Sequence, residues 1–152
     1  AAPSDLYKRH AYKSAEIAIL IMKNNFDVKV IMTRTAEDFI TPLTFETLTN
    51  GKVYQYNTIV KESPMLHIDL AKWADIILVA PSTAEFMSKL TFGRADDLLT
   101  TTCLAFDKTL YMSGYFTNLG GTVYPMSRCK FTKKRGAENT FVVRKPLRTL
   151  LE

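Results

Sequence analysis

Hydrophobic and polar positions along this chain follow two different periods, one typical of buried strands and one typical of amphipathic helices. Two short apolar runs rich in β-branched residues, 27–32 (DVKVIM) and 75–80 (DIILVA), predict strands that are covered on both faces. Apolar residues spaced three and four apart predict helices over 11–24, 68–73 and 84–92. Strands that alternate with helices in this way favour an α/β fold with a parallel sheet.

Shorter segments complete the pattern. Gly93 is a candidate C-cap for the helix over 84–92, and Asp96 or Asp97 is a candidate N-cap for the next one. A doubly wound fold would place a strand and a glycine-bearing turn before the first helix, but residues 1–10 contain no apolar run and no glycine. The remaining predicted elements are helices over 44–49 and 98–106 and strands over 53–54, 109–112, 122–124 and 141–144.

The turn that leaves the second strand carries candidate binding chemistry. Pro81, Ser82 and Thr83 end the strand, and a helix follows from Ala84. Free backbone N–H groups and hydroxyls at a helix N-terminus bind phosphate or another anion. Ligands of open α/β sheets gather at the carboxyl ends of strands. The residues that follow the first strand are therefore candidates too: Thr33, Thr35, Phe39 and Thr41. For Phe39 the alternative is packing in the core.

Three further side chains have possible chemical roles. His67 precedes the helix that leads into the second strand, and an imidazole exchanges protons near neutral pH. The alternative is a purely structural histidine. Cys103 is expected to be a small buried hydrophobe. Cys129 lies between Arg128 and Lys130, whose charges favour a thiolate, and the alternative is an incidental exposed thiol.

Several of these segments carry a family resemblance through their order and spacing. In that arrangement they resemble the flavin-dependent cysteine decarboxylase family, which includes the phosphopantothenoylcysteine decarboxylases of coenzyme A synthesis. The likeness covers roughly residues 11–106, and it implies one Rossmann-like flavoprotein domain over 1–152 with a doubly wound parallel sheet. The segments are AYKSAE at 11–16, FITPL at 39–43, HIDL at 67–70, WAD at 73–75, APSTA at 80–84 and GRADDLLTT at 93–101.

The resemblance also implies a cofactor and roles for particular residues. FMN is the implied cofactor, with no metal, and its expected contacts are Thr33, Phe39, Thr41, Ser82, Thr83, Ala84 and Glu85. His67 matches the family's catalytic base. Cys129 lies at roughly the distance of a cysteine on the family's substrate-binding flap, which donates a proton during flavin reoxidation. The implied substrate is a phosphorylated cysteine conjugate, phosphopantothenoylcysteine, and the implied assembly is a homo-oligomer, a trimer or a dodecamer.

Two departures from the family pattern keep a second function open. The first strand and its glycine turn are missing before residue 11, and 113–121 lacks the family's proline-x-methionine-asparagine segment. Either these segments have been lost, or the sequence as given lacks them; a true loss favours a non-catalytic descendant that serves as a binding or scaffold subunit. Residues 107–152 are divergent and carry a net charge of +6, against −1 for 1–106. A basic segment suits a phosphorylated ligand or a nucleic acid, and the alternative is a solvated face or tail without a partner. No aromatic-basic recognition motif accompanies it, so nucleic acid binding is disfavoured.

Length and composition exclude several classes of protein, such as disordered and membrane-spanning chains. A chain of 152 residues with 47% hydrophobic and 23% charged residues is typical of one globular domain and unlike a disordered chain. No apolar run approaches the roughly 20 residues that span a bilayer. The first ten residues lack the apolar centre of a signal peptide, and two cysteines form no disulfide framework. We therefore expect a cytoplasmic protein without membrane attachment.

Overall fold

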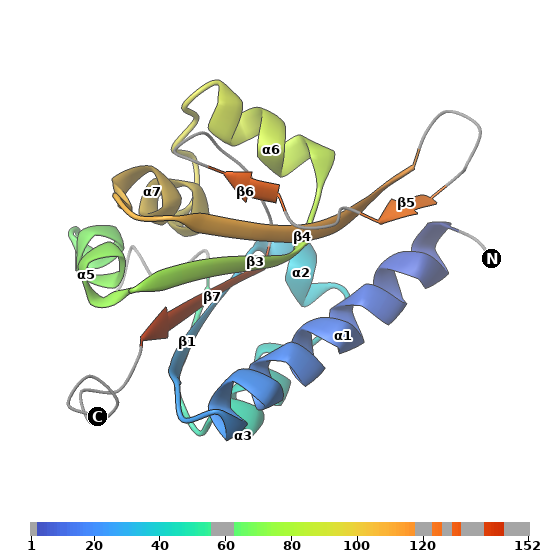
Figure 1. Ribbon diagram of the computed structural model, residues 1–152, viewed down its shortest axis with the longest axis horizontal. Helices are drawn as coiled ribbons and strands as arrows, with labels where there is room; N and C mark the ends of the chain where they lie inside the picture. The colour runs from blue at the N-terminus through green and yellow to red at the C-terminus, as the bar shows by residue number, and fades with distance from the viewer. Residues whose placement is uncertain (1–2, 56–62, 118–122, 126–128, 132–138, 145–152) are drawn as a thin grey trace.

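The protein is an α/β structure built around one mixed sheet (Figure 1). The computed structural model describes residues 3–55, 63–117, 123–125, 129–131 and 139–144, with side chains described over 12–55 and 63–112. The described strands form a sheet of order β2-β1-β7-β3-β4-β5, and β6 also pairs with β4. The strands are β1 (Asp27–Met32), β2 (Val53–Tyr54), β3 (Ile76–Ser82), β4 (Leu110–Thr117), β5 (Val123–Pro125), β6 (Cys129–Phe131) and β7 (Asn139–Arg144).

Helices cover both faces of this sheet, as a doubly wound fold requires (Figure 1). On one face lie α1 (Pro3–Lys23), α2 (Arg34–Glu37) and α3 (Pro42–Thr49), and on the other lie α5 (Leu66–Trp73), α6 (Ala84–Thr91) and α7 (Leu98–Ala105). The predicted α/β class is confirmed. The pairs β1–β2 and β3–β4 are parallel, and antiparallel pairs involve β5, β6 and β7.

Alternating side chains of the buried strands supply two separate cores. In β1, Val30 and Met32 point toward α1 and α3, whereas Ile31 between them points toward the other face. In β3, Ile77 and Val79 pack with the helices α5, α6 and α7. Successive strand residues face opposite sides, so continuous apolar runs such as IILVA are the pattern expected of strands covered twice.

The first helix is longer than the sequence pattern predicts. We expected it to begin near residue 11, and it begins at Pro3. Proline fits the first helical turn because that turn needs no backbone N–H donor, and no glycine or further proline interrupts the chain up to Lys23. His10 therefore belongs to a helix and not to an irregular head.

The predicted strand FVVR exists as part of β7, but its position in the sheet could not be anticipated. β7 lies antiparallel between β1 and β3, with Lys29 and Ile77 both opposite Val142. It therefore joins the two halves of the sheet. A strand that directly precedes the first helix is absent from the described residues, because α1 already occupies 3–23.

Candidate functional site

The turn after β3 has the local structure that the sequence predicts for a binding turn. The strand continues through Pro81 to Ser82, and Thr83 is the N-cap of α6, with its Oγ1 accepting a hydrogen bond of 3.3 Å from the backbone N–H of Phe86. Ser82 is only 3% exposed, and its Oγ has no hydrogen-bond partner within the described residues. A buried hydroxyl without a partner is costly, so this atom is suited to accept or donate a bond to a ligand.

The loop after β1 presents a second group of hydroxyls. Thr33 is the N-cap of α2, and its Oγ1 accepts a hydrogen bond of 3.2 Å from the backbone N–H of Ala36. Thr41 precedes Pro42 at the start of α3, and its Oγ1 lies 3.0 Å from the Oγ1 of Thr44. Phe39 is 36% exposed and is not part of either core, so the core-packing alternative for this residue is wrong.

A polar cavity of about 320 Å³ lies between these two segments. It brings together three of the candidate site residues: Thr33 and Thr35, which follow β1, and Glu85 in the first turn of α6. The sequence interpretation did not assign its other lining residues to a site: Arg34, Phe86, Lys89, Asp96 and Asp97.

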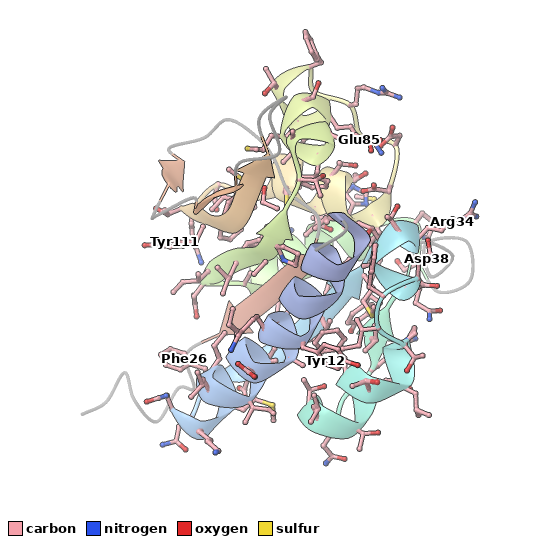
Figure 2. All side chains as sticks on the ribbon, turned by 90° about the vertical axis from the view of Figure 1, so that its right-hand side faces the viewer. Tyr12, Phe26, Arg34, Asp38, Glu85 and Tyr111 are labelled. Carbon is pink, nitrogen blue, oxygen red and sulfur yellow. The ribbon has the colours of Figure 1, made fainter. Side chains whose placement is uncertain are left out.

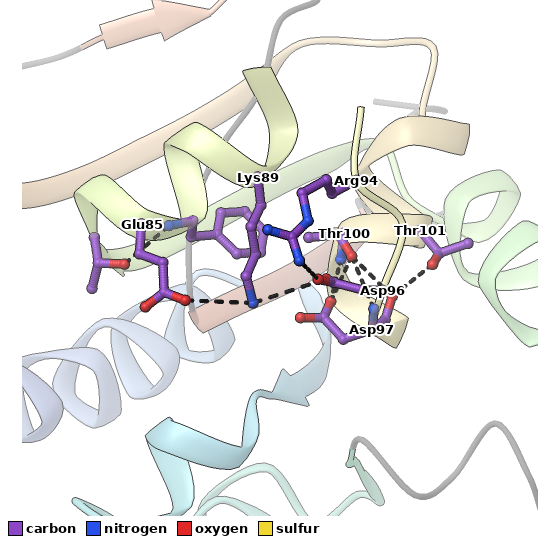
Figure 3. Close-up of polar contacts among 9 residues, drawn as sticks. Glu85, Lys89, Arg94, Asp96, Asp97, Thr100 and Thr101 are labelled. Carbon is purple, nitrogen blue, oxygen red and sulfur yellow. Dashed lines mark hydrogen bonds and ion pairs between the residues drawn. The ribbon is translucent and has the colours of Figure 1, made fainter. Parts of the chain in front are cut away.

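Charged side chains line this cavity and contact one another (Figure 3). Lys89 Nζ lies 3.8 Å from Glu85 Oε1 and 3.9 Å from Asp96 Oδ1, and it joins the first turn of α6 to the loop before α7. The Nη2 of Arg94 lies 3.2 Å from Asp96 Oδ2. The spacing of four residues between Glu85 and Lys89 on one helix is the sequence signal that could have identified the first of these pairs.

Asp97 has a structural role at the edge of the same cavity. Its Oδ1 accepts a hydrogen bond of 2.7 Å from the backbone N–H of Thr100, and the Thr100 Oγ1 reaches back to the Asp97 backbone N–H at 3.2 Å. These bonds form a capping box at the start of α7 (Figure 3). The prediction of Asp96 or Asp97 as N-cap is thus confirmed for Asp97, and Gly93 has the left-handed φ of 67° expected after a helix.

His67 does not line the polar cavity. It is the second residue of α5 and is half-buried. Cys129 is the first residue of β6 and lies opposite Met112 of β4, and its side chain lies outside the described residues. Cys103 is buried, as expected. The described structure thus brings Thr33 and Glu85 to one cavity but does not add either predicted catalytic residue to it.

The described part of the chain can be searched for membrane-spanning helices and for metal-binding groups of side chains. None of its helices combines the length and the apolar character that crossing a bilayer requires. Among the same residues there is no group of three or more histidine, cysteine, aspartate or glutamate side chains arranged to hold a metal ion.

Comparison with known proteins places this architecture in a family. Residues 9–117 match the family model described as Flavoprotein. The coenzyme A biosynthesis bifunctional protein CoaBC of Haemophilus influenzae is 41% identical over 104 residues, 68% of this chain and 26% of that protein. CoaBC of Bacillus subtilis is 46% identical over 96 residues, 62% of this chain and 23% of that protein. The chain thus spans about a quarter of the length of the curated relatives it matches.

A solved structure shares the fold. The FMN-dependent cysteine decarboxylase SpaF superposes with a TM-score of 0.53 at 30% sequence identity, over 57% of this chain and 50% of that one. The family model covers most of the described residues, from α1 to the end of β4. The resemblance inferred from the order of sequence motifs is therefore confirmed: this chain belongs to the Flavoprotein family.

Proposed function

We propose that this chain binds FMN and catalyses the decarboxylation of a cysteine conjugate, phosphopantothenoylcysteine, to give phosphopantetheine in coenzyme A synthesis. The names of the CoaBC relatives and of the structural neighbour SpaF support this activity. The structural observation that carries the proposal is the buried Oγ of Ser82, which has no partner among the described residues and lies at the carboxyl end of β3 directly before α6. That is the position where open α/β sheets bind nucleotides.

The residues at the turn fit such a ligand. Ser82 supplies a buried hydroxyl, and the backbone N–H groups of Ala84 and Glu85 belong to the first turn of α6, where intrahelical acceptors are missing. Thr83 is already engaged as the N-cap, so its role is to hold the turn in shape. From the other side of the site, Phe39 offers an exposed ring for stacking, and Thr41 offers a hydroxyl.

Bound FMN would supply the two-electron oxidation of the substrate thiol that lets the adjacent carboxylate leave as carbon dioxide. The protein contributes binding, orientation and proton transfer. We propose that the imidazole of His67 accepts the proton of the substrate thiol. His67 is half-buried at the first turn of α5. The two electrons held by the reduced flavin would return to the decarboxylated enethiol, and Cys129 is the proposed proton donor in that reduction; without such a donor the product would remain an enethiol.

His67 does not line the cavity that includes Thr33 and Glu85, which bears on assembly. We propose a homo-oligomer, a trimer or a dodecamer, in which His67 of one copy approaches the turn of another. The substrate is a phosphorylated small molecule, and the basic residues over 107–152 favour it electrostatically. The proposed location is the cytoplasm, where the free thiols would stay reduced.

FMN binding is tested by comparing the FMN affinity of two variants, one at Ser82 in the turn after β3 and one at Ser88 in α6. Purified protein is titrated with FMN, and binding is followed by quenching of flavin fluorescence. Ser82→Ala removes the buried hydroxyl and should weaken FMN binding by about tenfold, which corresponds to one lost hydrogen bond to a ligand. Ser88→Ala, on the exposed side of α6, is the matched control and should bind as the parent does. Equal affinity in all three proteins would refute the role of Ser82.

A second function is favoured by one observation. β4 runs through 113–117 without the proline-x-methionine-asparagine segment of the family. A chain without that segment would retain the fold as a binding or scaffold subunit. Protein that stays colourless after incubation with FMN, or that releases no carbon dioxide from phosphopantothenoylcysteine, would support this alternative, whereas carbon dioxide release would exclude it.

A further inference from the structure

Lys89 lies between two carboxylates that line the polar cavity (Figure 3). Its side chain is only 24% exposed, and its Nζ lies 3.8 Å from Glu85 Oε1 and 3.9 Å from Asp96 Oδ1. Both separations exceed the roughly 3 Å of a hydrogen bond, so the two contacts are mainly electrostatic. One ammonium group thus balances carboxylates from two segments, the first turn of α6 and the loop before α7.

The end of α6 explains why Asp96 lies near Lys89. Gly93 has a left-handed φ of 67°, and the backbone N–H of Arg94 donates a hydrogen bond of 2.8 Å to the carbonyl of Lys89. These features end the helix and reverse the direction of the chain. Asp97 then begins α7 through its capping box. The contact between Lys89 and Asp96 therefore follows from backbone hydrogen bonds at both ends of the loop.

The charges around the cavity balance only when Lys89 is included. Its lining residues carry three carboxylates and two cationic groups, which belong to Glu85, Asp96, Asp97, Arg34 and Lys89. Arg94 supplies a third cationic group, because its Nη2 lies 3.2 Å from Asp96 Oδ2. Without the ammonium group of Lys89, one carboxylate of this group would remain without a compensating charge.

The same cavity includes two of the proposed FMN contacts, Thr33 and Glu85. Figure 2 shows Glu85 and Arg34 toward one side of the molecule, with Phe26 toward the other. Charge interactions extend over roughly 8 Å at physiological ionic strength, so a phosphate bound in or beside a cavity of about 320 Å³ experiences the net charge of its walls. FMN carries a phosphate with nearly two negative charges, whereas riboflavin carries none. The charge of the cavity therefore affects the two flavins differently.

We propose that Lys89 determines the preference of this site for a phosphorylated flavin. Its ammonium group acts through Glu85 and Asp96: it neutralises their carboxylates and so removes a repulsion that would disfavour an anionic ligand. Lys89 is thus a specificity-determining residue that positions charge around the ligand. The inference rests on the proposed binding of FMN, and it adds a residue that the order of the sequence motifs does not indicate.

Titration of the purified protein with FMN and, separately, with riboflavin tests this role. Lys89→Met removes the charge and keeps a long unbranched side chain. It should lower the ratio of FMN affinity to riboflavin affinity by about tenfold, because only FMN is repelled by the uncompensated carboxylate. Lys89→Arg should retain the parent ratio. Lys108→Met is the matched control: it removes a lysine whose Nζ lies 3.2 Å from Asp75 Oδ1, directly before β3, and it should also retain the ratio.

A second variant does not depend on the folding of Lys89→Met. Glu85→Gln leaves Lys89 in place and removes one negative charge, so it should raise the ratio of FMN affinity to riboflavin affinity by about threefold. The double variant Lys89→Met with Glu85→Gln should regain most of the parent ratio, which the mere loss of a structural contact would not allow. At about 1 M salt the difference between the parent and Lys89→Met should largely disappear.

Three results would overturn the role of Lys89. Equal losses of FMN and riboflavin binding in Lys89→Met would show a structural role only. Unchanged FMN binding in that variant, or an unchanged ratio in Glu85→Gln, would show that the charge of the cavity does not select the ligand. A parent protein that binds neither flavin would refute the proposed function and this inference together, whereas a parent that binds both, with the same ratio in every variant, would refute the role of Lys89 alone.

Discussion

Ser14 in α1 donates a hydrogen bond of 2.6 Å from its Oγ to the backbone carbonyl of Ala80 in β3, across 66 residues of sequence. Both residues are buried. The bond ties the middle of α1 to the strand end that carries Ser82, two residues further on. The hydroxyl of Ser14 thus has a role in packing the helix against the sheet.

Ser14→Ala should therefore destabilise the fold. The substitution leaves the carbonyl of Ala80 without this donor in a buried position, which costs about 1–3 kcal/mol of unfolding free energy. Chemical denaturation monitored by circular dichroism measures the loss. Ser88→Ala, exposed on α6, is the control and should change stability by less than about 0.5 kcal/mol. Equal stability of the two variants would show that the bond contributes little.

Val142→Pro should disrupt the sheet far more than a proline in an edge strand. The backbone at Val142 lies between Lys29 of β1 and Ile77 of β3, and proline removes a donor from this internal strand. We expect a loss of about 3 kcal/mol or more, with reduced soluble yield. Tyr124→Pro in β5, which pairs only with β4 in the described sheet, is the comparison. A Val142→Pro protein as stable as Tyr124→Pro would contradict the central position of β7.

His67→Asn should abolish decarboxylation without releasing the cofactor. The proposed imidazole accepts the substrate proton, whereas asparagine occupies a similar volume but exchanges no proton. Loss of a positioned acid–base group lowers the rate by about 10²–10⁴-fold. Carbon dioxide release from phosphopantothenoylcysteine measures the rate, and flavin absorbance after desalting measures retention. Persistent release at the parent rate would remove His67 from the mechanism, and loss of flavin would indicate a binding role instead.

The partly buried phenol of Tyr54 should make the free energy of unfolding decrease at alkaline pH. Burial raises the pKa of its phenol above the usual 10.0, because the folded protein disfavours the phenolate. A group whose pKa is raised on folding contributes its stability in full below the unfolded pKa and loses it as pH rises through the folded one. Unfolding free energy should thus fall above pH 10.0, and the fall should be shallower in Tyr54→Phe. Identical pH profiles for the two proteins would exclude this linkage.

Local sequence patterns predicted the elements that depend on local chemistry. The run 27–32 matches β1 residue for residue, and Asp97 and Gly93 have the capping roles that their side chains or backbone favour. Each of these features is decided by neighbours within a few residues. Hydrophobic period and cap chemistry are therefore sufficient to place them.

Features that depend on distant partners were not predictable in this way. Nothing local in FVVR indicates that β7 pairs with both β1 and β3, because pairing partners are set by the whole sheet. The contact of Lys89 with Asp96 needs the loop between α6 and α7 to fold back. Whether His67 lines the cavity at Thr33 depends on how α5 packs against the sheet, which the motif order does not specify, and in the structure it does not line it.

The placement of β7 also affects how the protein is made. β1 and β3 emerge from the ribosome before the strand that bridges them, which is not complete until Arg144 has been added. Until then the nascent chain exposes two unpaired apolar strand edges, which are templates for wrong pairing. The two halves of the sheet therefore cannot be joined until β7 has been synthesised, and chaperones that shield strand edges should raise the yield of native protein.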